Sequence, residues 1–125
     1  MTFEIRTSKK TMQIFQQIEN SEQLHPFVLS KLAIALSIKS KISLSSEDFK
    51  SDNNGLELSR QTITGENDIV YKSLIEMFEK KHLSNDEYFK VYLKAHLDRG
   101  AILLLNEQRY SRNFLIHLLN LEKSI

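Results

Sequence analysis

Hydrophobic residues in the first part of the chain follow two different periods. Over residues 2–6, Phe3 and Ile5 alternate with polar neighbours, which predicts a short β-strand because successive strand side chains face opposite sides. Over residues 9–22, apolar positions recur at three- and four-residue intervals, which predicts an amphipathic helix. The apolar positions of this helix are Met12, Phe15 and Ile18.

The next segment is apolar on most sides. Pro26 suits the first turn of a helix, where its missing N–H costs nothing, and the residues from 27 to 38 are mostly hydrophobic. We expect a second helix that is buried on more than one face, either by the protein itself or by a second copy. Residues 40–65 have no sustained period and are rich in turn-forming residues. Scattered apolar anchors predict that this long connector packs over the core; they are Leu44, Phe49, Leu56 and Leu58.

Helical spacing returns in the second half of the chain. After Glu66, five apolar residues line one face of a predicted helix: Ile69, Val70, Leu74, Met77 and Phe78. Ser84 and Glu87 match a capping box that opens the longest helix. We expect one broad face of it to carry Phe89, Tyr92, Leu93, His96, Leu97, Gly100, Leu103 and Leu104. Gly100 lies within this helix and predicts close packing against another helix or, alternatively, close approach of a DNA backbone. A short closing helix is expected from about Ser111.

The order strand, helix, turn, helix is that of a ribbon-helix-helix unit. We predict a mainly helical, all-α class of fold with one short N-terminal strand and additional C-terminal helices, in a single domain over residues 1–125. The chain has 3 glycines and 1 proline, which also favours helix. In a ribbon-helix-helix protein two chains pair their strands and present the outward side chains to the DNA major groove. Here those side chains would be Thr2, Glu4 and Arg6.

The amino-acid composition excludes several classes of functional site. The chain has no cysteine, which excludes disulfides, thiolate metal sites and cysteine nucleophiles. Residues 1–6 do not form a hydrophobic signal region, and no apolar run approaches the length of about 20 residues that spans a membrane. We therefore expect a cytoplasmic protein with no membrane partner.

Charge is distributed unevenly along the chain. The net charge is +1 overall, but residues 1–41 carry +3, residues 42–70 carry −4 and residues 71–125 carry +2. A basic N-terminal unit suits a protein that meets a polyanion with one face; the alternative is that these charges only solvate the surface. The candidate phosphate-binding residues of this unit are Arg6, Lys9, Lys10, Lys31, Lys39 and Lys41.

Catalytic and metal-binding patterns are weak. The four histidines do not show the spacing of a helical metal site, nucleotide-binding loops do not occur, and no cofactor is expected. His96 and Arg99 share a helix face and could grip a phosphate. Alternatively, His96 is a core histidine and Arg99 pairs with a carboxylate such as Asp98 or Glu66. A nuclease would need two converging carboxylates and a metal ion, which nothing in the pattern requires.

Several blocks of the sequence resemble a known family. They are Arg6-Thr7-Ser8-Lys9, the stretch from Pro26 to Ser37, Thr62-Ile63-Thr64-Gly65-Glu66 and Lys94-Ala95-His96-Leu97-Asp98-Arg99-Gly100. Together they look like the corresponding blocks of DndE, the small protein of the bacterial DNA sulfur-modification (phosphorothioation) system. The resemblance covers roughly residues 4–105. Two positions depart from the family pattern: Asp98 stands where an amide is expected, and Lys31 where arginine is expected.

The resemblance implies a non-catalytic, DNA-binding homotetramer that prefers nicked duplex. It also implies partners in the modification machinery: a cysteine desulfurase, an iron–sulfur ATP-pyrophosphatase-like enzyme and a structural-maintenance-type ATPase. Arg99 joins the candidate DNA-binding residues, and the metal and catalytic sets stay empty. Three other functions remain open from the sequence: a transcription repressor that reads DNA through its strand, an assembly scaffold driven by the apolar helix over residues 27–38, and a nicking nuclease.

Overall fold

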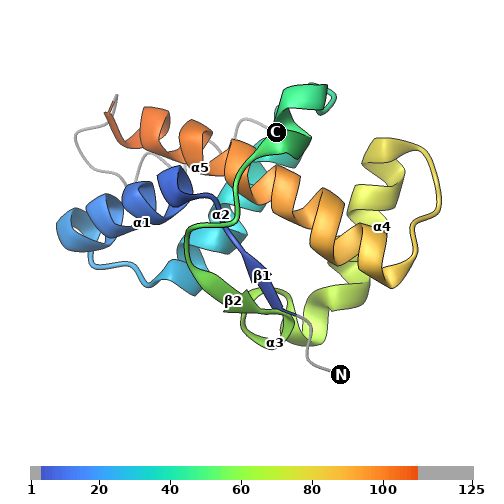
Figure 1. Ribbon diagram of the computed structural model, residues 1–125, viewed down its shortest axis with the longest axis horizontal. Helices are drawn as coiled ribbons and strands as arrows, with labels where there is room; N and C mark the ends of the chain where they lie inside the picture. Colours follow the sequence, from blue (N-terminus) through green and yellow to red (C-terminus); the bar gives the residue numbers. More distant parts are fainter. Residues whose placement is uncertain (1–3, 110–125) are drawn as a thin grey trace.

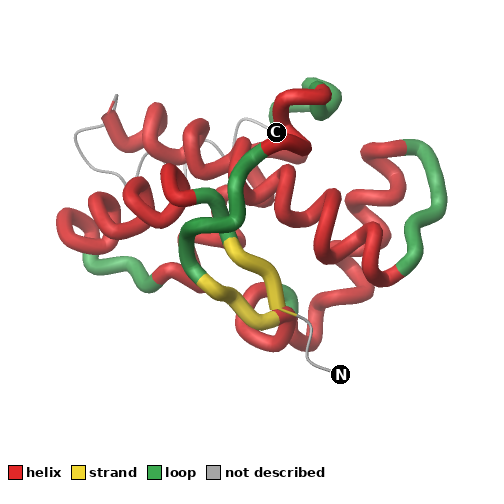
Figure 2. The backbone as a smooth tube through the Cα atoms, in the orientation of Figure 1, coloured by secondary structure: helices red, strands yellow, loops and turns green. Residues whose placement is uncertain are grey.

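Helices make up most of the described chain, residues 4–109, in this computed structural model (Figures 1 and 2). The α-helices are α1 (Lys9–Glu22), α2 (Pro26–Lys39), the short α3 (Arg60–Ile63), α4 (Asp68–Glu79) and α5 (Lys94–Arg109). Two strands, β1 (Glu4–Arg6) and β2 (Glu57–Ser59), form a small antiparallel ribbon. Single turns of 3₁₀-helix, η1 (Ser46–Lys50) and η2 (Gly65–Asn67), interrupt the connectors, and a π-helical segment, η3 (Glu87–Leu93), leads into α5. The predicted mainly helical fold is confirmed.

The centre of the fold is the crossing of α2 over α5. Gly100 lies at this crossing, and a Cβ atom added to it would stand 1.8 Å from the Ala33 carbonyl oxygen. Only glycine lets the two helix backbones approach so closely. The prediction that Gly100 serves close helix packing is therefore confirmed.

Helix α2 is buried on several sides, as its sequence indicates. Leu29, Ala33 and Ile34 are completely buried and share one side of the helix. Partly buried Leu32, Leu36 and Ile38 pack against the core on its flanks. The polar residue Ser30 is buried too, and its hydroxyl donates to the Pro26 carbonyl oxygen at 2.8 Å, so the burial leaves no unpaired hydroxyl. The described chain itself, chiefly α5, supplies this cover.

Helix α1 matches its predicted bounds. The Ser8 hydroxyl accepts a hydrogen bond from the Thr11 N–H and caps the first turn. At the other end Gln23 adopts a left-handed conformation (φ 58°) that stops the helix. Phe15 and Ile18 are fully buried as expected.

The two-stranded ribbon forms within one chain. β1 pairs with β2 so that Ile5 lies opposite Leu58 and Arg6 opposite Glu57. In a ribbon-helix-helix dimer this edge of β1 would pair with the strand of a second chain, so the element order follows that architecture and the strand pairing differs from it. β2 is not visible in the sequence pattern, because three residues are too few to show a period of two.

The long connector packs against the rest of the chain, and of its predicted anchors Leu58 is buried while Phe49 is 42% exposed. The Gly55 N–H donates to the Thr7 carbonyl oxygen at 2.8 Å, and a Cβ at Gly55 would stand 2.2 Å from the Ser8 carbonyl oxygen. Ser45 and Asp48 form a reciprocal capping box that starts η1. The loop therefore lies against the turn between β1 and α1.

The predicted helix with one apolar face is present as α4, and most of that face is exposed. Its apolar stripe points outward: Ile69, Val70, Leu74 and Met77 are exposed, and Ile75 is the buried residue of the helix. Figure 1 shows α4 at one end of the molecule, beside the start of α5. The predicted capping box before the longest helix is confirmed by hydrogen bonds between Ser84 and Glu87. The expected closing helix from about Ser111 lies outside the described residues.

Candidate nucleic-acid interface

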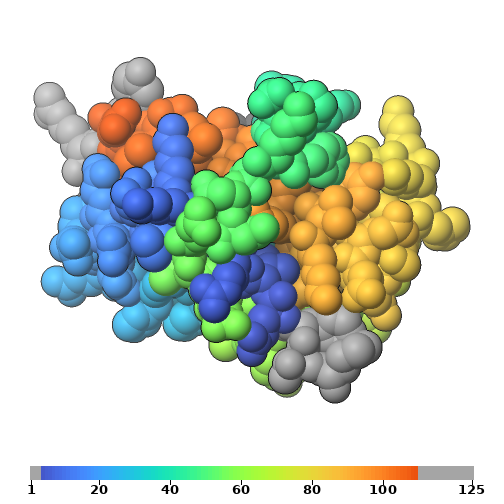
Figure 3. Space-filling model, in the orientation of Figure 1, coloured from blue at the N-terminus to red at the C-terminus, as the bar shows by residue number. Residues whose placement is uncertain are grey.

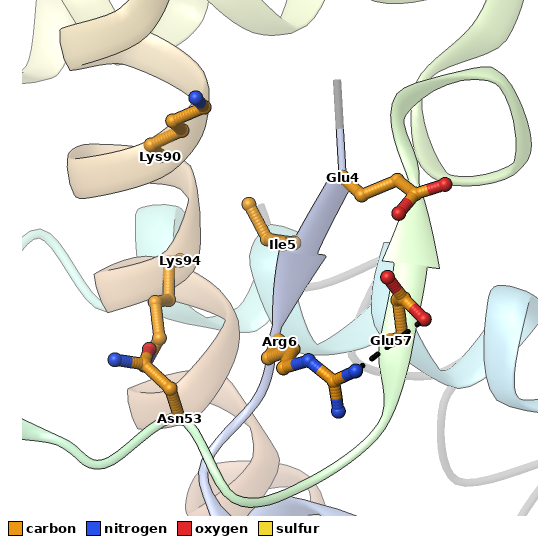
Figure 4. Close-up of a pocket in the computed structure, with 7 residues that line it drawn as sticks. All are labelled: Glu4, Ile5, Arg6, Asn53, Glu57, Lys90 and Lys94. Carbon is orange, nitrogen blue, oxygen red and sulfur yellow. Dashed lines mark ion pairs between the residues drawn. The ribbon is translucent and has the colours of Figure 1, made fainter. Parts of the chain in front are cut away.

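A groove runs between the β-ribbon and the helix that carries Lys90 and Lys94 (Figure 4). Its volume is about 440 Å³. Both signs of charge line it: Glu4, Ile5, Arg6, Asn53, Glu57, Lys90 and Lys94. In the space-filling view, β1, the start of α1, the green connector and the orange helical segment share one face of the molecule (Figure 3).

The cations of the groove differ in how far they are neutralised. Arg6 forms an exposed ion pair with Glu57 at 3.6 Å, which in water is worth less than about 1 kcal/mol. Lys94 is mostly buried and donates to Asp98 at 2.7 Å. Lys90 is exposed and forms no ion pair with any of residues 4–109. Lys90 is therefore the most available amine of the groove.

The carboxylates on the ribbon side lie next to each other. Figure 4 shows the Glu4 and Glu57 side chains on the same side of the ribbon. The pKa of Glu4 is raised, because it shares a hydrogen bond with Glu57 and because the Glu57 charge disfavours its ionised form. The raised pKa means that the Glu4 carboxyl holds its proton to a higher pH than an isolated glutamate.

Lys9 and Lys10 begin α1 beside this groove. The Lys9 N–H donates to the Asp52 carboxylate at 2.9 Å, and Asp52 precedes the groove residue Asn53. The pKa of Asp52 is lowered by the N–H groups of Asn54 and Lys9, which hydrogen-bond its ionised form. The side chains of Lys9 and Lys10 are exposed and make no ion pair within residues 4–109. The Lys9 backbone thus lies next to the connector that supplies Asn53 to the groove, whereas neither Lys9 nor Lys10 lines the groove itself.

The Asp98 carboxylate hydrogen-bonds to groups from three different segments of the chain. Its Oδ1 accepts hydrogen bonds from the Ser8 N–H at 3.1 Å and the Thr11 hydroxyl at 2.7 Å. Its Oδ2 accepts from Ser51 at 2.6 Å and from Lys94 at 2.7 Å. The carboxylate therefore joins the start of α1, the connector and α5, a task that uses more acceptor capacity than an amide has.

Arg99 is turned into the protein. Nε donates to the Ser37 hydroxyl at 2.8 Å, Nη1 to the Ile42 carbonyl oxygen at 2.7 Å and Nη2 to the Ser37 carbonyl oxygen at 2.9 Å. Longer contacts reach the carbonyl of Ser43 and the hydroxyl of Ser40. The suggested pairing of Arg99 with Asp98 or Glu66 is wrong, because backbone carbonyls and hydroxyls hold the guanidinium while Asp98 pairs with Lys94. Arg99 closes the C-terminal end of α2, where orphan carbonyl groups need donors.

His96 is a core histidine, as one of the two sequence interpretations held. It is completely buried, and its Nδ1 lies 2.8 Å from the Ser37 hydroxyl. Because that hydroxyl accepts from Arg99, its own hydrogen is free to donate to Nδ1, which puts the imidazole proton on Nε2. Nε2 faces the Glu79 carboxylate at 3.5 Å. Burial, helped by the charge of Arg99, lowers the pKa of His96 to about 4, and burial raises the pKa of Glu79.

The three other predicted cations lie on α2 or just after it. Lys31 is half-buried, with its Nζ 5.8 Å from the centre of the Phe27 ring. Lys39 is in the last turn of α2, and Lys41 follows it in a left-handed conformation (φ 60°). None of these three lines the groove. Conversely, the sequence interpretation missed Lys90 and Lys94; their spacing of four on a predicted helix was the available signal.

Two further features of residues 4–109 concern metal binding and membrane crossing. These residues bring together no group of three histidines, aspartates or glutamates able to hold a metal ion. None of their helices is both long enough and apolar enough to cross a membrane.

Comparison with known proteins supplies the family. The model of the family described as DNA sulphur modification protein DndE matches residues 4–112. A crystal structure of DndE from Escherichia coli B7A, involved in DNA phosphorothioation modification, is similar with a TM-score of 0.64 and 22% identity, over 81% of this chain and 93% of that chain. A DndE mutant involved in DNA phosphorothioation is similar with a TM-score of 0.63 and 21% identity, over 80% and 94%. No curated protein sequence gives a significant match. The match over most of the chain, together with the shared fold, shows that this chain belongs to the DndE family of DNA sulphur modification proteins.

Proposed function

We propose that this chain is the non-catalytic DNA-binding subunit of a DNA phosphorothioate-modification machinery. Its groove face would contact the phosphates of a duplex, and the chain would work as a homotetramer alongside the cysteine desulfurase, the ATP-pyrophosphatase-like enzyme and the structural-maintenance-type ATPase. The family supports the modification context. The observation that supports the DNA-binding part is that Arg6 and the exposed Lys90 line one groove, with the start of α1, which carries Lys9 and Lys10, held next to its connector wall.

Phosphate contact suits these side chains. Lys9, Lys10 and Lys90 are exposed amines without ion-pair partners among residues 4–109, so a phosphate does not have to displace a carboxylate to reach them. Arg6 gives up only a weak exposed pair with Glu57. Such contacts bind DNA without reading its sequence and weaken steeply as salt rises. A nicked duplex bends more easily than an intact one, which would let a curved protein face make more contacts.

The partner enzymes would carry out the reactions that transfer sulfur to DNA. The chain has no cysteine, so it cannot carry sulfur as a persulfide or attack through a thiolate. His96, the most strongly perturbed histidine, is completely buried and cannot meet a DNA substrate in this conformation.

The test is binding to intact and nicked duplexes of one random sequence across a salt series. Replacing Lys9 and Lys10 together by glutamine should weaken binding and leave assembly intact. Adding Lys90→Gln should weaken it further, and each lost phosphate contact should reduce the slope of log K against log salt by about 0.9. Lys72→Gln is the control for the loss of a single lysine charge, because Lys72 lies on α4 and donates to Asn85 away from the groove. If the triple variant bound DNA with wild-type affinity, these three lysines would not belong to the DNA-binding site.

The alternatives give different results in the same assay. A repressor would prefer one sequence over random DNA by about 10³ or more and would ignore nicks. A scaffold would assemble without salt-dependent DNA binding. Metal-dependent cleavage of the duplex would indicate the nicking nuclease.

A further inference from the structure

The outward face of α4 is apolar and carries no charge. Ile69 is 79% exposed, Met77 75%, Val70 56% and Leu74 43%. Ser73 is also exposed and lies in the middle of this face. We call these five residues the α4 stripe.

Two charged residues of α4 contact the segment that follows the helix and do not belong to the stripe. Lys72 donates to the Asn85 side chain at 3.1 Å, and the Glu76 carboxylate accepts the Leu83 N–H at 2.8 Å. On the inner side, Ile75 is buried and the Phe78 ring packs edge-on against His96 at 5.0 Å. Both the core face and the polar face of α4 therefore have their partners within the chain, whereas residues 4–109 cover the α4 stripe only in part.

A continuous stripe of this kind marks an interaction surface. Single exposed apolar residues are normal on protein surfaces, whereas contiguous ones are typical of contact sites. Four of the nine exposed large hydrophobic residues of the described chain lie on this one helix. Burial of these side chains against a partner gains about 25 cal/mol for each Å² removed from water.

We propose that the α4 stripe pairs with the α4 stripe of a second copy of this chain, antiparallel and about a twofold axis at Ser73. In this register Ile69 lies opposite the partner's Met77, and Ser73 opposite the partner's Ser73. The small serine at the axis lets the two helices approach closely at the crossing. A second copy presents the same surface, which is the condition for an isologous interface.

The charges at the two ends of the stripe favour this partner. Glu66 precedes the stripe and Lys80 follows it, and both are exposed. Glu66 lies in the turn before α4 and Lys80 is its C-cap residue, so antiparallel pairing about the axis brings the end of one helix that carries Glu66 to the end of the other that carries Lys80. Antiparallel pairing also sets the positive N-terminal end of each helix dipole beside the negative C-terminal end of the other. A parallel pair would bring like charges together at both ends.

This inference rests on the self-association included in the proposed function, and it is independent of the DNA contacts. The groove residues and the α4 stripe belong to different elements: Arg6 to β1, Lys9 and Lys10 to α1, Lys90 to η3. Assembly and DNA binding can therefore fail separately, and each has its own measurement.

A charge exchange tests the register. Lys80→Glu and Glu66→Lys each create two like-charged contacts by symmetry, so each should raise the dissociation constant of the α4 contact about tenfold in low salt. The double variant Glu66→Lys/Lys80→Glu should restore it. Mass is measured by sedimentation across a dilution series, with thermal unfolding to confirm the fold and salt-dependent DNA binding in parallel. A monomeric wild-type chain, unchanged single variants, or a double variant that stays dissociated would each overturn the proposal.

A covalent probe tests the axis directly. The chain has no cysteine, so Ser73→Cys introduces a single thiol whose disulfide can only join two copies. Such a bond needs Cα atoms about 4.4–6.8 Å apart, which the twofold axis provides. Under mild oxidation Ser73→Cys should form a covalent dimer faster than Gln16→Cys, a control on an exposed position of α1. Equal rates, or stable binding of the stripe to a different protein in place of a second copy, would refute the pairing.

Discussion

The buried histidine of α5 provides a sharp test of the packing at the junction of α2, α4 and α5. The Arg99 guanidinium donates to Ser37, Ser37 donates to His96, and His96 faces Glu79. Protonation of His96 would require its Nδ1 to become a donor, and the Ser37 oxygen would then have to accept from two cationic groups. The folded protein therefore resists protonation of this ring. His96→Gln removes the titration and keeps a side chain that can hydrogen-bond.

The size of the effect follows from the pKa shift. The pKa of His96 falls from 6.5 to about 4, chiefly because the ring is buried. The unfolded chain then binds the proton more readily than the folded chain, so this group costs stability as pH falls below 6.5, and the cost levels off near pH 4. At 1.36 kcal/mol for each pKa unit, the full cost is about 3 kcal/mol, of which about 2 kcal/mol has developed by pH 4.5.

Urea unfolding of the wild type and of His96→Gln at pH 7.0, 6.0, 5.0 and 4.5 measures this cost. The free energy of unfolding of the wild type should fall by about 2 kcal/mol more than that of the variant over this range. The raised pKa of Glu79 acts with the opposite sign, since its protonation on acidification relieves a buried charge, and it is present in both proteins. Parallel pH profiles would refute the burial argument.

Three further changes test the packing by urea unfolding. Gly100→Ala should lower the free energy of unfolding by at least about 2 kcal/mol despite the better helix propensity of alanine, because the Ala33 carbonyl occupies the space; a gain in stability would contradict the close crossing. Asp98→Asn should cost about 3 kcal/mol by leaving the mostly buried Lys94 without its anion, and a loss below about 1 kcal/mol would show that the network is dispensable. Gly65→Ala should cost only about 1 kcal/mol, since Gly65 has φ +49° but open space around it, and a larger loss would reveal an unseen contact.

Local patterns in the sequence were enough for most of the helices. The bounds of α1 and the start of α2 follow from apolar periodicity and from Pro26, because helix formation depends on residues three or four positions apart. Gly100 could be assigned to helix packing for a similar reason, since a glycine in mid-helix needs a compensating contact. The family resemblance likewise rested on short blocks, and the family match confirms it.

The tertiary structure decided which of these local features face each other. Ser37 and Arg99 are 62 residues apart, and no pattern in either helix indicates that one caps the other. In the sequence, Asp98 is only an acid at a position where an amide is expected, and the folded chain shows it joining Ser8, Ser51 and Lys94. The apolar face of α4 is mostly exposed, which the sequence could not show, because periodicity reports that a helix has an apolar side but not what covers it. Which side of a helix meets the core is set by long-range packing, and the sequence of a single element does not contain that information.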